Sequence, residues 1–189
     1  MPQAKTLSAR ELKRVLQDVA TRKHAARNRL MILMTHLAGM RVGEVAAVLK
    51  GDVINPDGSV RDEIRLTAEQ TKGRHARVVF VSDKLRREIA VYISTIAERP
   101  STAHLFATQK RSAFSANTAC QALNAIYQRA GIDGASSHSG RRSFITTLSS
   151  RGVGVRVLAR LAGHRSLASV MPYIDASDDM LRNAVELIG

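Results

Sequence analysis

The sequence predicts a mainly α-helical fold with one small antiparallel β-sheet, an α+β arrangement in a single domain of residues 1–189. Most of the chain places apolar residues at the helical spacing of i, i+3, i+4 and i+7. One region, from Ile64 to Val81, instead contains alternating and β-branched residues, which is typical of strands. No internal repeat or interdomain linker interrupts the chain, and 189 residues with 44% hydrophobic content suffice for one sizeable core.

The first part of the chain predicts three helices. Ser8 and Glu11 have the spacing of a capping box and begin the first helix. A second helix over residues 24–38 is apolar around most of its girth, so we expect it to be central. Gly39 is suited to end that helix, and a short helix over residues 42–50 follows.

The predicted sheet is a hairpin. A turn-forming composition at residues 55–58 precedes it. Ile64 and Leu66 alternate with charged neighbours, as on a half-buried strand, and residues 77–81 form a second β-rich run. The polar, basic connection between the two strands places Lys72 near the turn.

The rest of the chain is predicted to be helical. The expected helix starts are Ser82 or Asp83, Ser115, Ser137 and Val155, and the expected ends include Gly131 and Gly163. A short helix beginning at Ser166 leads to Pro172 and Tyr173. The last expected helix covers residues 178–188 and is amphipathic.

The net charge is the first functional clue. It is +13 at pH 7, with an isoelectric point near 11, and an excess of this size favours polyanions, of which nucleic acid is the commonest. A basic surface kept only for solubility is the alternative. The basic residues are spread along the chain and not gathered in a tail, so we expect a folded binding face for nucleic acid.

Cysteine content and hydropathy exclude several classes of protein. Cys120 is the only cysteine, so neither an intramolecular disulfide nor a cysteine-cluster metal site can form, which fits a reducing compartment. No apolar run approaches the length that spans a membrane. The chain has no P-loop, no His-Glu-x-x-His and no clear acidic metal cluster. We therefore expect a cytoplasmic protein with no membrane partner, metal or cofactor.

A group of basic and phenolic residues is the candidate site. His138 and Arg141 lie three positions apart on one helical turn, and residues 136–150 contain no acid that could pair with them. An anionic ligand could supply the negative charge that pairs with them. Arg41, at the start of a helix, is suited to bind phosphate because a helix N-terminus already favours anions. Taken singly, each candidate also has an ordinary reading, such as a solvated arginine or a packed tyrosine.

Three strings and one spacing resemble a known family, the tyrosine recombinases or phage integrase family. Residues 37–45 (Leu-Ala-Gly-Met-Arg-Val-Gly-Glu-Val) resemble its first signature box. Residues 138–141 resemble its His-x-x-Arg box, and residues 161–166 its Leu-Gly-His box. Tyr173 follows His164 at the family's spacing.

The resemblance implies a phosphate-binding set. Arg41 and Arg141 would hold the scissile phosphate, the second as a bidentate clamp, and His164 would hydrogen-bond a non-bridging oxygen. Preorganised cations of this kind can stabilise a pentavalent phosphorane without a metal.

The resemblance also implies a nucleophile and its proton carriers. Tyr173 would attack the phosphate, Lys72 would protonate the leaving 5′ oxygen, and His138 would assist proton transfer. Arg74 and Lys84 are the alternatives to Lys72 as the lysine-type donor of the hairpin. Two departures stand near Tyr173. Pro172 should make the helix kink or begin anew, and Arg142 occupies a position where the family often has His, with little consequence expected.

The resemblance runs from about residue 6 to residue 188 and covers the family's catalytic domain. We expect the helical domain that precedes it in most members to be absent, as in a short recombinase of the fimbrial invertase type or in a domain cut from a longer protein. We expect a site-specific DNA recombinase or integrase with a 3′-phosphotyrosyl intermediate. We also expect a homotetramer on synapsed DNA sites, with residues 175–188 docking in trans. The alternatives are a type IB topoisomerase-like DNA relaxer and a DNA-binding regulator with an idle site.

Overall fold

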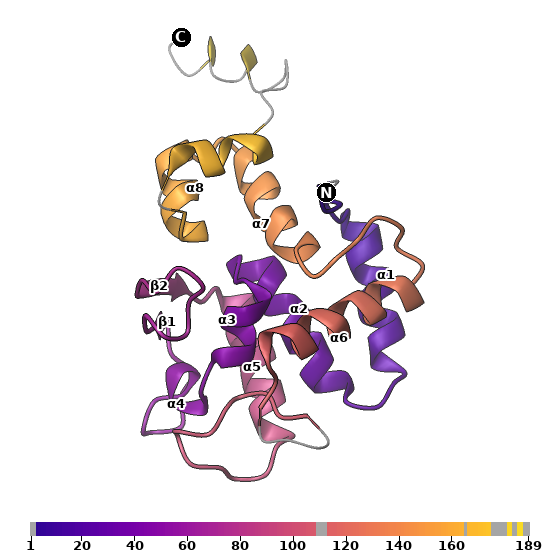
Figure 1. Cartoon of the computed structure of the whole chain (residues 1–189), viewed down its shortest axis with the longest axis vertical. Helices are drawn as coiled ribbons and strands as arrows, with labels where there is room; N and C mark the ends of the chain where they lie inside the picture. The colour runs from indigo at the N-terminus through magenta and orange to yellow at the C-terminus, as the bar shows by residue number, and fades with distance from the viewer. Residues whose placement is uncertain (1–2, 109–112, 165, 175–180, 183–184, 187–189) are drawn as a thin grey trace.

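The computed structural model describes residues 3–108, 113–164, 166–174, 181–182 and 185–186 (Figure 1). Its elements in order are α1 (Ala9–Ala20), α2 (Ala25–Ala38), α3 (Val42–Ala47), α4 (Lys50–Val53), β1 (Glu63–Leu66), β2 (Arg77–Phe80), α5 (Asp83–Ser94), α6 (Ala116–Arg129), α7 (Ser139–Ser150), α8 (Val155–Ala162), and the 3-10 turns η1 (Leu167–Ser169) and η2 (Met171–Tyr173). This confirms the mainly helical fold with a small antiparallel sheet. No helix in the described part of the chain is both long and apolar enough to cross a membrane.

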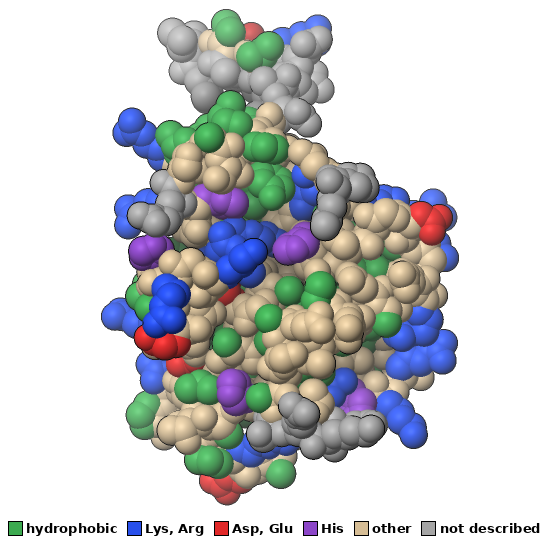
Figure 2. Space-filling model, viewed as in Figure 1, with side chains coloured by type: hydrophobic (Ala, Val, Ile, Leu, Met, Phe, Trp, Pro, Cys, Tyr) green, Lys and Arg blue, Asp and Glu red, His purple; other side chains and the backbone are tan. Residues whose placement is uncertain are grey.

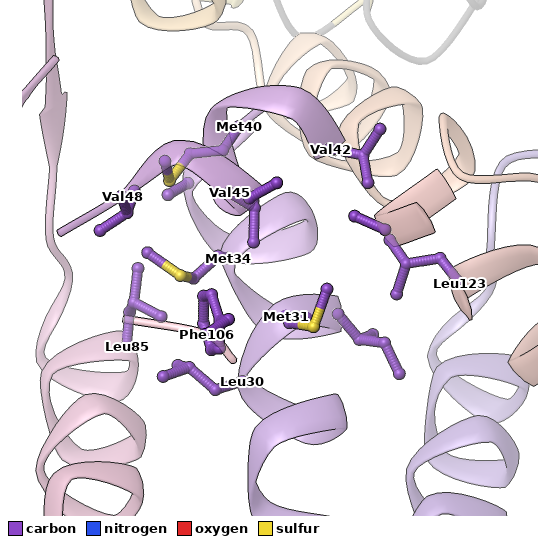
Figure 3. Packing of buried hydrophobic residues seen from close by; sticks show 14 of the residues in the cluster. Leu30, Met31, Met34, Met40, Val42, Val45, Val48, Leu85, Phe106 and Leu123 are labelled. Carbon is purple, nitrogen blue, oxygen red and sulfur yellow. The ribbon is translucent and has the colours of Figure 1, made fainter. Parts of the chain in front are cut away.

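Helix α2 is the centre of the molecule, as its apolar girth predicts. Its run of five residues from Leu30 to Met34 is buried, and α1, α5 and α7 pack around it. Figure 3 shows Leu30, Met31 and Met34 converging with Phe106 and with side chains of α3 and α5. Burying a side chain of this size contributes roughly 1.5–3 kcal/mol. Gly39 ends the helix in the left-handed conformation, with φ +60°.

The segment before α1 is fastened to α7. Ser8 and Glu11 form the predicted capping box at the start of α1. One residue earlier, the backbone N–H of Leu7 donates to Ser143 Oγ at 2.7 Å, and that hydroxyl donates in turn to the Ser139 carbonyl. The N-terminal segment therefore lies against the helix that carries Arg141.

The predicted helix over residues 42–50 is confirmed as far as Ala47 and wrong beyond it. The chain is helical only to Ala47, becomes extended at Val48 and Leu49, and starts α4 at Lys50. A tertiary pairing explains the break: Leu105 N–H donates to the Val48 carbonyl, and Lys50 N–H donates to the Ala103 carbonyl, each at 2.8 Å. Local periodicity does not report such a long-range pairing.

Strands β1 and β2 form the predicted hairpin. The register pairs Ile64 with Val79 and Leu66 with Arg77. Ile64 and Val79 face the core, while Phe80 is exposed. The connection between the strands carries Lys72 in an exposed stretch, residues 72–76, that follows the buried Thr71.

Helix α7 starts one residue later than expected. Its N-cap is His138 and not Ser137, because the Ser137 hydroxyl, which would have to cap the helix, is 2.9 Å from Cys120 Sγ instead. The helix lies directly against α2: a Cβ on Gly140 would come within 2.0 Å of Thr35 Oγ1. The absence of a side chain at Gly140 sets the distance between the two helices that bracket the candidate site.

Helices α7 and α8 and the two 3-10 turns enclose a second, smaller core around Ile145, Leu158 and Val170. Helix α8 covers the predicted residues and ends at Gly163, with φ +65°. Pro172 lies in the first turn of η2, where its missing N–H is tolerated, so the chain begins a new turn there as expected. Of the expected helix over residues 178–188, the described residues Leu181, Arg182, Val185 and Glu186 are helical, and the rest lies outside the described residues.

Candidate active site

A groove of about 1080 Å³ runs between the β-hairpin and α8. Arg41, Lys72, His75, Arg77 and His164 line it, together with residues of α8 and η1. Figure 2 shows Lys and Arg side chains gathered on this face, flanked by histidines, beneath an apolar area. Arg74 and Lys84, the alternatives to Lys72, are not among the residues that line the groove.

Arg141 is the most deeply placed of the predicted residues, with 6% of its surface exposed. Its guanidinium donates to the Gly39 carbonyl at 2.6 Å and to the Ala162 carbonyl at 2.5 Å. It therefore joins the C-terminal ends of α2 and α8. Burial, followed by the charge of Arg41, lowers the pKa of Arg141 to about 9, which leaves it a cation at neutral pH.

His164 is held by Arg141. The Nη2 of Arg141 lies 2.9 Å from His164 Nε2. A guanidinium only donates, so Nε2 accepts and the ring proton of a neutral His164 lies on Nδ1. Burial and the charges of Arg141 and Arg41 lower the pKa of His164 to about 4, so the ring is neutral at pH 7.

Arg41 is anchored through a buried carboxylate. Glu44, 1% exposed, accepts from the Arg41 backbone N–H at 2.8 Å and from its Nη1 at 3.0 Å. The Nη2 of Arg41 donates to the Gly163 carbonyl at 3.2 Å. This geometry fixes the first arginine beside the loop that carries His164.

Arg77 shares the same carboxylate. Its Nε and Nη2 donate to the two oxygens of Glu44 at 3.2 and 2.7 Å, and its Nη1 donates to the Leu161 carbonyl at 3.0 Å. Burial alone would raise the pKa of Glu44, but the hydrogen bonds and charges of Arg77 and Arg41 outweigh it and lower the pKa. Arg77 thus ties the hairpin to the end of α8.

His138 faces this cationic cluster from the start of α7. Its pKa lies below the ordinary value because of lost hydration and then because of the charges of Arg141, Lys72 and Arg41. The imidazole is therefore neutral at pH 7. Lys72 is exposed on its hairpin at the edge of the groove.

Tyr173 is a neighbour of His164. The centroids of the two rings are 6.2 Å apart. The guanidinium of Arg142 lies 5.2 Å from the centroid of the tyrosine ring, a contact that the sequence did not predict. Tyr173 is half-buried against the second core.

The structure brings the six predicted residues to one region: Arg41, Lys72, His138, Arg141, His164 and Tyr173. Two neighbours were not predicted, and a third, Arg142, was named without its contact with Tyr173. Glu44 had a signal, because it follows Arg41 at the spacing of a helix cap. Arg77 had none, since its contacts join segments far apart in sequence. Among the described residues there is no group of three or more His, Cys, Asp or Glu side chains that could hold a metal ion.

Comparison with known proteins agrees with this geometry. The signature of the phage integrase family matches residues 5–180. The chain is 30% identical to tyrosine recombinase XerA of Thermococcus kodakarensis over 186 residues, which is 96% of this chain and 62% of that protein. It is 27% identical to tyrosine recombinase XerD of Corynebacterium glutamicum over 157 residues, or 82% of this chain and 50% of the relative. The chain thus spans between half and two thirds of the length of these relatives.

Solved structures share the fold. The crystal structure of XerA recombinase superposes with a TM-score of 0.75 at 21% identity, over 99% of this chain and 63% of that one. The catalytic domain of bacteriophage HP1 integrase superposes with a TM-score of 0.69 at 20% identity, over 97% of this chain and 95% of that one. XerH recombinase bound to palindromic difH substrate, in a post-cleavage complex, superposes with a TM-score of 0.71 at 23% identity, over 95% of this chain and 51% of that one. A signature that spans most of the chain, a relative at 30% identity and the converging basic and phenolic side chains all lead to one assignment: the chain belongs to the phage integrase family.

Proposed function

We propose that this protein is a site-specific DNA recombinase that breaks and rejoins double-stranded DNA through a 3′-phosphotyrosyl intermediate. Residues 1–189 would act as a single catalytic domain, in the cytoplasm and without a metal or cofactor. The observation that carries the proposal is the closeness of two guanidiniums, a neutral imidazole and a phenol. Arg41 and Arg141 donate to adjacent backbone carbonyls at the end of α8, and Arg141 also contacts His164. The centroid of the Tyr173 ring lies 6.2 Å from that of His164. The names of relatives that are tyrosine recombinases support it.

The cleavage step forms one bond and breaks one. The Oη of Tyr173 bonds to the scissile phosphorus, and the bond from phosphorus to the 5′ oxygen breaks. Neutral His138 is in the state that can accept the phenol proton, and Lys72 gives a proton to the leaving 5′ oxygen. The phosphotyrosyl ester conserves the phosphodiester energy, so rejoining needs no ATP.

Arg41, Arg141 and His164 would stabilise the phosphorane. The two guanidiniums are fixed to backbone carbonyls, Arg41 to that of Gly163 and Arg141 to those of Gly39 and Ala162, so little reorganisation is needed when negative charge develops. While Arg141 binds Nε2 of His164, the ring proton lies on Nδ1, so Nδ1–H is the donor that His164 could offer to a phosphate oxygen.

DNA is the substrate that the charge supports. Neutralising phosphates with Lys and Arg releases condensed counterions, so affinity should fall steeply as salt rises.

We further propose a homotetramer on two synapsed sites. The segment that would dock onto a neighbouring subunit contains Leu181 and Val185, two apolar side chains that are 57% and 69% exposed.

The test uses a pool of nicked duplexes with a randomised central sequence, because the DNA site is unknown. A covalent adduct that survives denaturing electrophoresis is expected with the wild type and not with Tyr173→Phe. Sequencing the bound DNA then identifies a target duplex. No adduct with the wild type would favour a DNA-binding regulator, and an adduct that persists in Tyr173→Phe would show another nucleophile.

Two assays on the recovered duplex separate recombination from relaxation. A recombinase joins strands between two sites on one plasmid. A type IB topoisomerase-like enzyme removes supercoils from a plasmid and exchanges nothing. We expect strand exchange, and relaxation without exchange would contradict the recombinase assignment.

A further inference from the structure

Arg142 lies between the N-terminal segment and Tyr173. Its Nε donates to Thr6 Oγ1 at 3.1 Å, and its guanidinium carbon stands 5.2 Å from the centroid of the tyrosine ring. The side chain is half-buried on α7. Within the described ranges, no carboxylate lies at ion-pair distance from Arg142, so the threonine hydroxyl and the phenol ring are the groups that meet its charge.

The local backbone alone gives Tyr173 little support. The residue ends a three-residue 3-10 turn, in which its N–H donates to the Val170 carbonyl at 2.9 Å. Pro172 contributes no N–H to that turn. The direction of the phenol therefore depends on side-chain contacts, and the cation on its face is one of them.

The N-terminal segment in turn fixes Arg142. Thr6 is held in place because Leu7 N–H binds Ser143 Oγ, on the turn of α7 next to Arg142. The threonine hydroxyl accepts from Nε, which orients the guanidinium plane. Thr6, Arg142 and Tyr173 form a continuous chain of contacts from the entry of the domain to the proposed nucleophile.

We propose that Arg142 is a positioning residue for the nucleophile: it holds the Tyr173 ring from one face, braced by Thr6, and stabilises the negative charge that spreads over the ring as the phenol loses its proton. The proposal rests on the assignment of Tyr173 as the attacking group. A guanidinium on an aromatic face is attractive for a neutral ring and more so for an anionic one. The contact thus strengthens along the reaction path and acts through Tyr173, not on the phosphate.

The first test needs no DNA. The chain has three tyrosines, so labelling with 3-fluorotyrosine gives three fluorine NMR signals, of which Tyr173→Phe identifies one. Arg142→Ala should move and narrow the Tyr173 signal and leave those of the buried Tyr92 and Tyr127 in place. Thr6→Val should produce a smaller shift in the same direction. An unmoved Tyr173 signal in Arg142→Ala would overturn the proposal, whatever the protein's reaction proves to be.

The second test uses single-turnover cleavage of the duplex recovered by covalent selection. Arg142→Ala should cleave about 3- to 30-fold more slowly, the range expected for one cation–π contact, with DNA affinity matching that of Arg151→Ala, which removes an equal charge from the exposed end of the same helix. Arg142→Lys keeps the charge but loses the hydrogen bond to Thr6, so its cleavage rate should lie between those of the wild type and Arg142→Ala.

A bypass of the tyrosine separates positioning from phosphate binding. In a Tyr173→Phe background, hydrogen peroxide can serve as the nucleophile: a peroxide oxygen bonds to phosphorus, the bond to the 5′ oxygen breaks, and that oxygen takes a proton. Adding Arg142→Ala should leave this peroxide-supported rate unchanged within about two-fold. An equal loss with and without Tyr173 would mean that Arg142 acts on the DNA. Absence of any adduct from the wild type would instead count against the proposed function and leave the fluorine result to decide on Arg142.

Discussion

Glu44→Gln should unfold more easily than the wild type because it removes the anion between two arginines. The carboxylate is 1% exposed and accepts four hydrogen bonds, two from Arg41 and two from Arg77. Gln keeps the shape but loses the charge. Arg77, whose side chain is 10% exposed, is then left as a buried cation without its counter-charge.

The size of the effect follows from burial. Removing one partner of a buried ion pair typically costs 3–5 kcal/mol. Arg41 is 29% exposed on its side chain and can reach water, so only Arg77 bears the full penalty. We expect the free energy of unfolding to fall by about 3 kcal/mol, at the lower end of that range.

Urea unfolding followed by circular dichroism at pH 7 measures this difference. Glu98→Gln is the matched control: Glu98 is exposed, and its change should stay within about 0.5 kcal/mol. The pKa of Glu44 is lowered in the folded protein, so its stabilisation is present above the ordinary glutamate pKa and is lost as pH falls through the lowered value. The gap between wild type and variant should therefore close in acid. A loss below about 1 kcal/mol at pH 7, or a gap that widens in acid, would refute the reasoning.

Three further outcomes follow from the same region. Gly163→Ala should destabilise by about 2 kcal/mol in thermal or chemical unfolding, because φ is +65° and the new Cβ would lie 2.6 Å from Arg77 Cδ; an unchanged midpoint would contradict it. Gly140→Ala should cost about 1–3 kcal/mol through its clash with Thr35, and adding Thr35→Ala should recover part of that loss, so a double-mutant cycle with no coupling would count against the clash. His164, with a pKa of about 4, binds its proton more weakly in the folded than in the unfolded protein, so the free energy of unfolding should decline as pH falls from about 6.5 toward 4. His164→Gln should make that decline shallower, which a comparison of unfolding at pH 7 and pH 5 measures.

The helices were largely predictable because their signals are local. Capping at Ser8 and Ser115 and the left-handed glycines at Gly39 and Gly163 are decided within a few residues of each helix end. The break after Ala47 was not predictable, since it depends on a pairing with residues 103–105. Local pattern and tertiary structure agree except where a distant segment competes for the same backbone groups.

The candidate site was predictable as a set of residue types and not as a network. Arg41, Arg141 and His164 could be named from short strings, but no string reveals that Arg141 and Arg41 both bind carbonyls at the end of α8. Arg77 begins a strand and reads as an ordinary surface arginine. Its contact with Glu44 exists only because the hairpin folds back over α3.

The network changes how the cluster of cations is understood. Arg41, Arg77 and Arg141 would repel one another in an isolated site, and one buried carboxylate together with four backbone carbonyls holds them in place. Glu44 offsets part of the charge, so the cluster remains net positive before any phosphate arrives. Carbonyl dipoles satisfy the donors without neutralising that charge. A site built in this way keeps its attraction for an anion and needs little rearrangement to receive one, which is the physical requirement for stabilising a phosphorane without a metal.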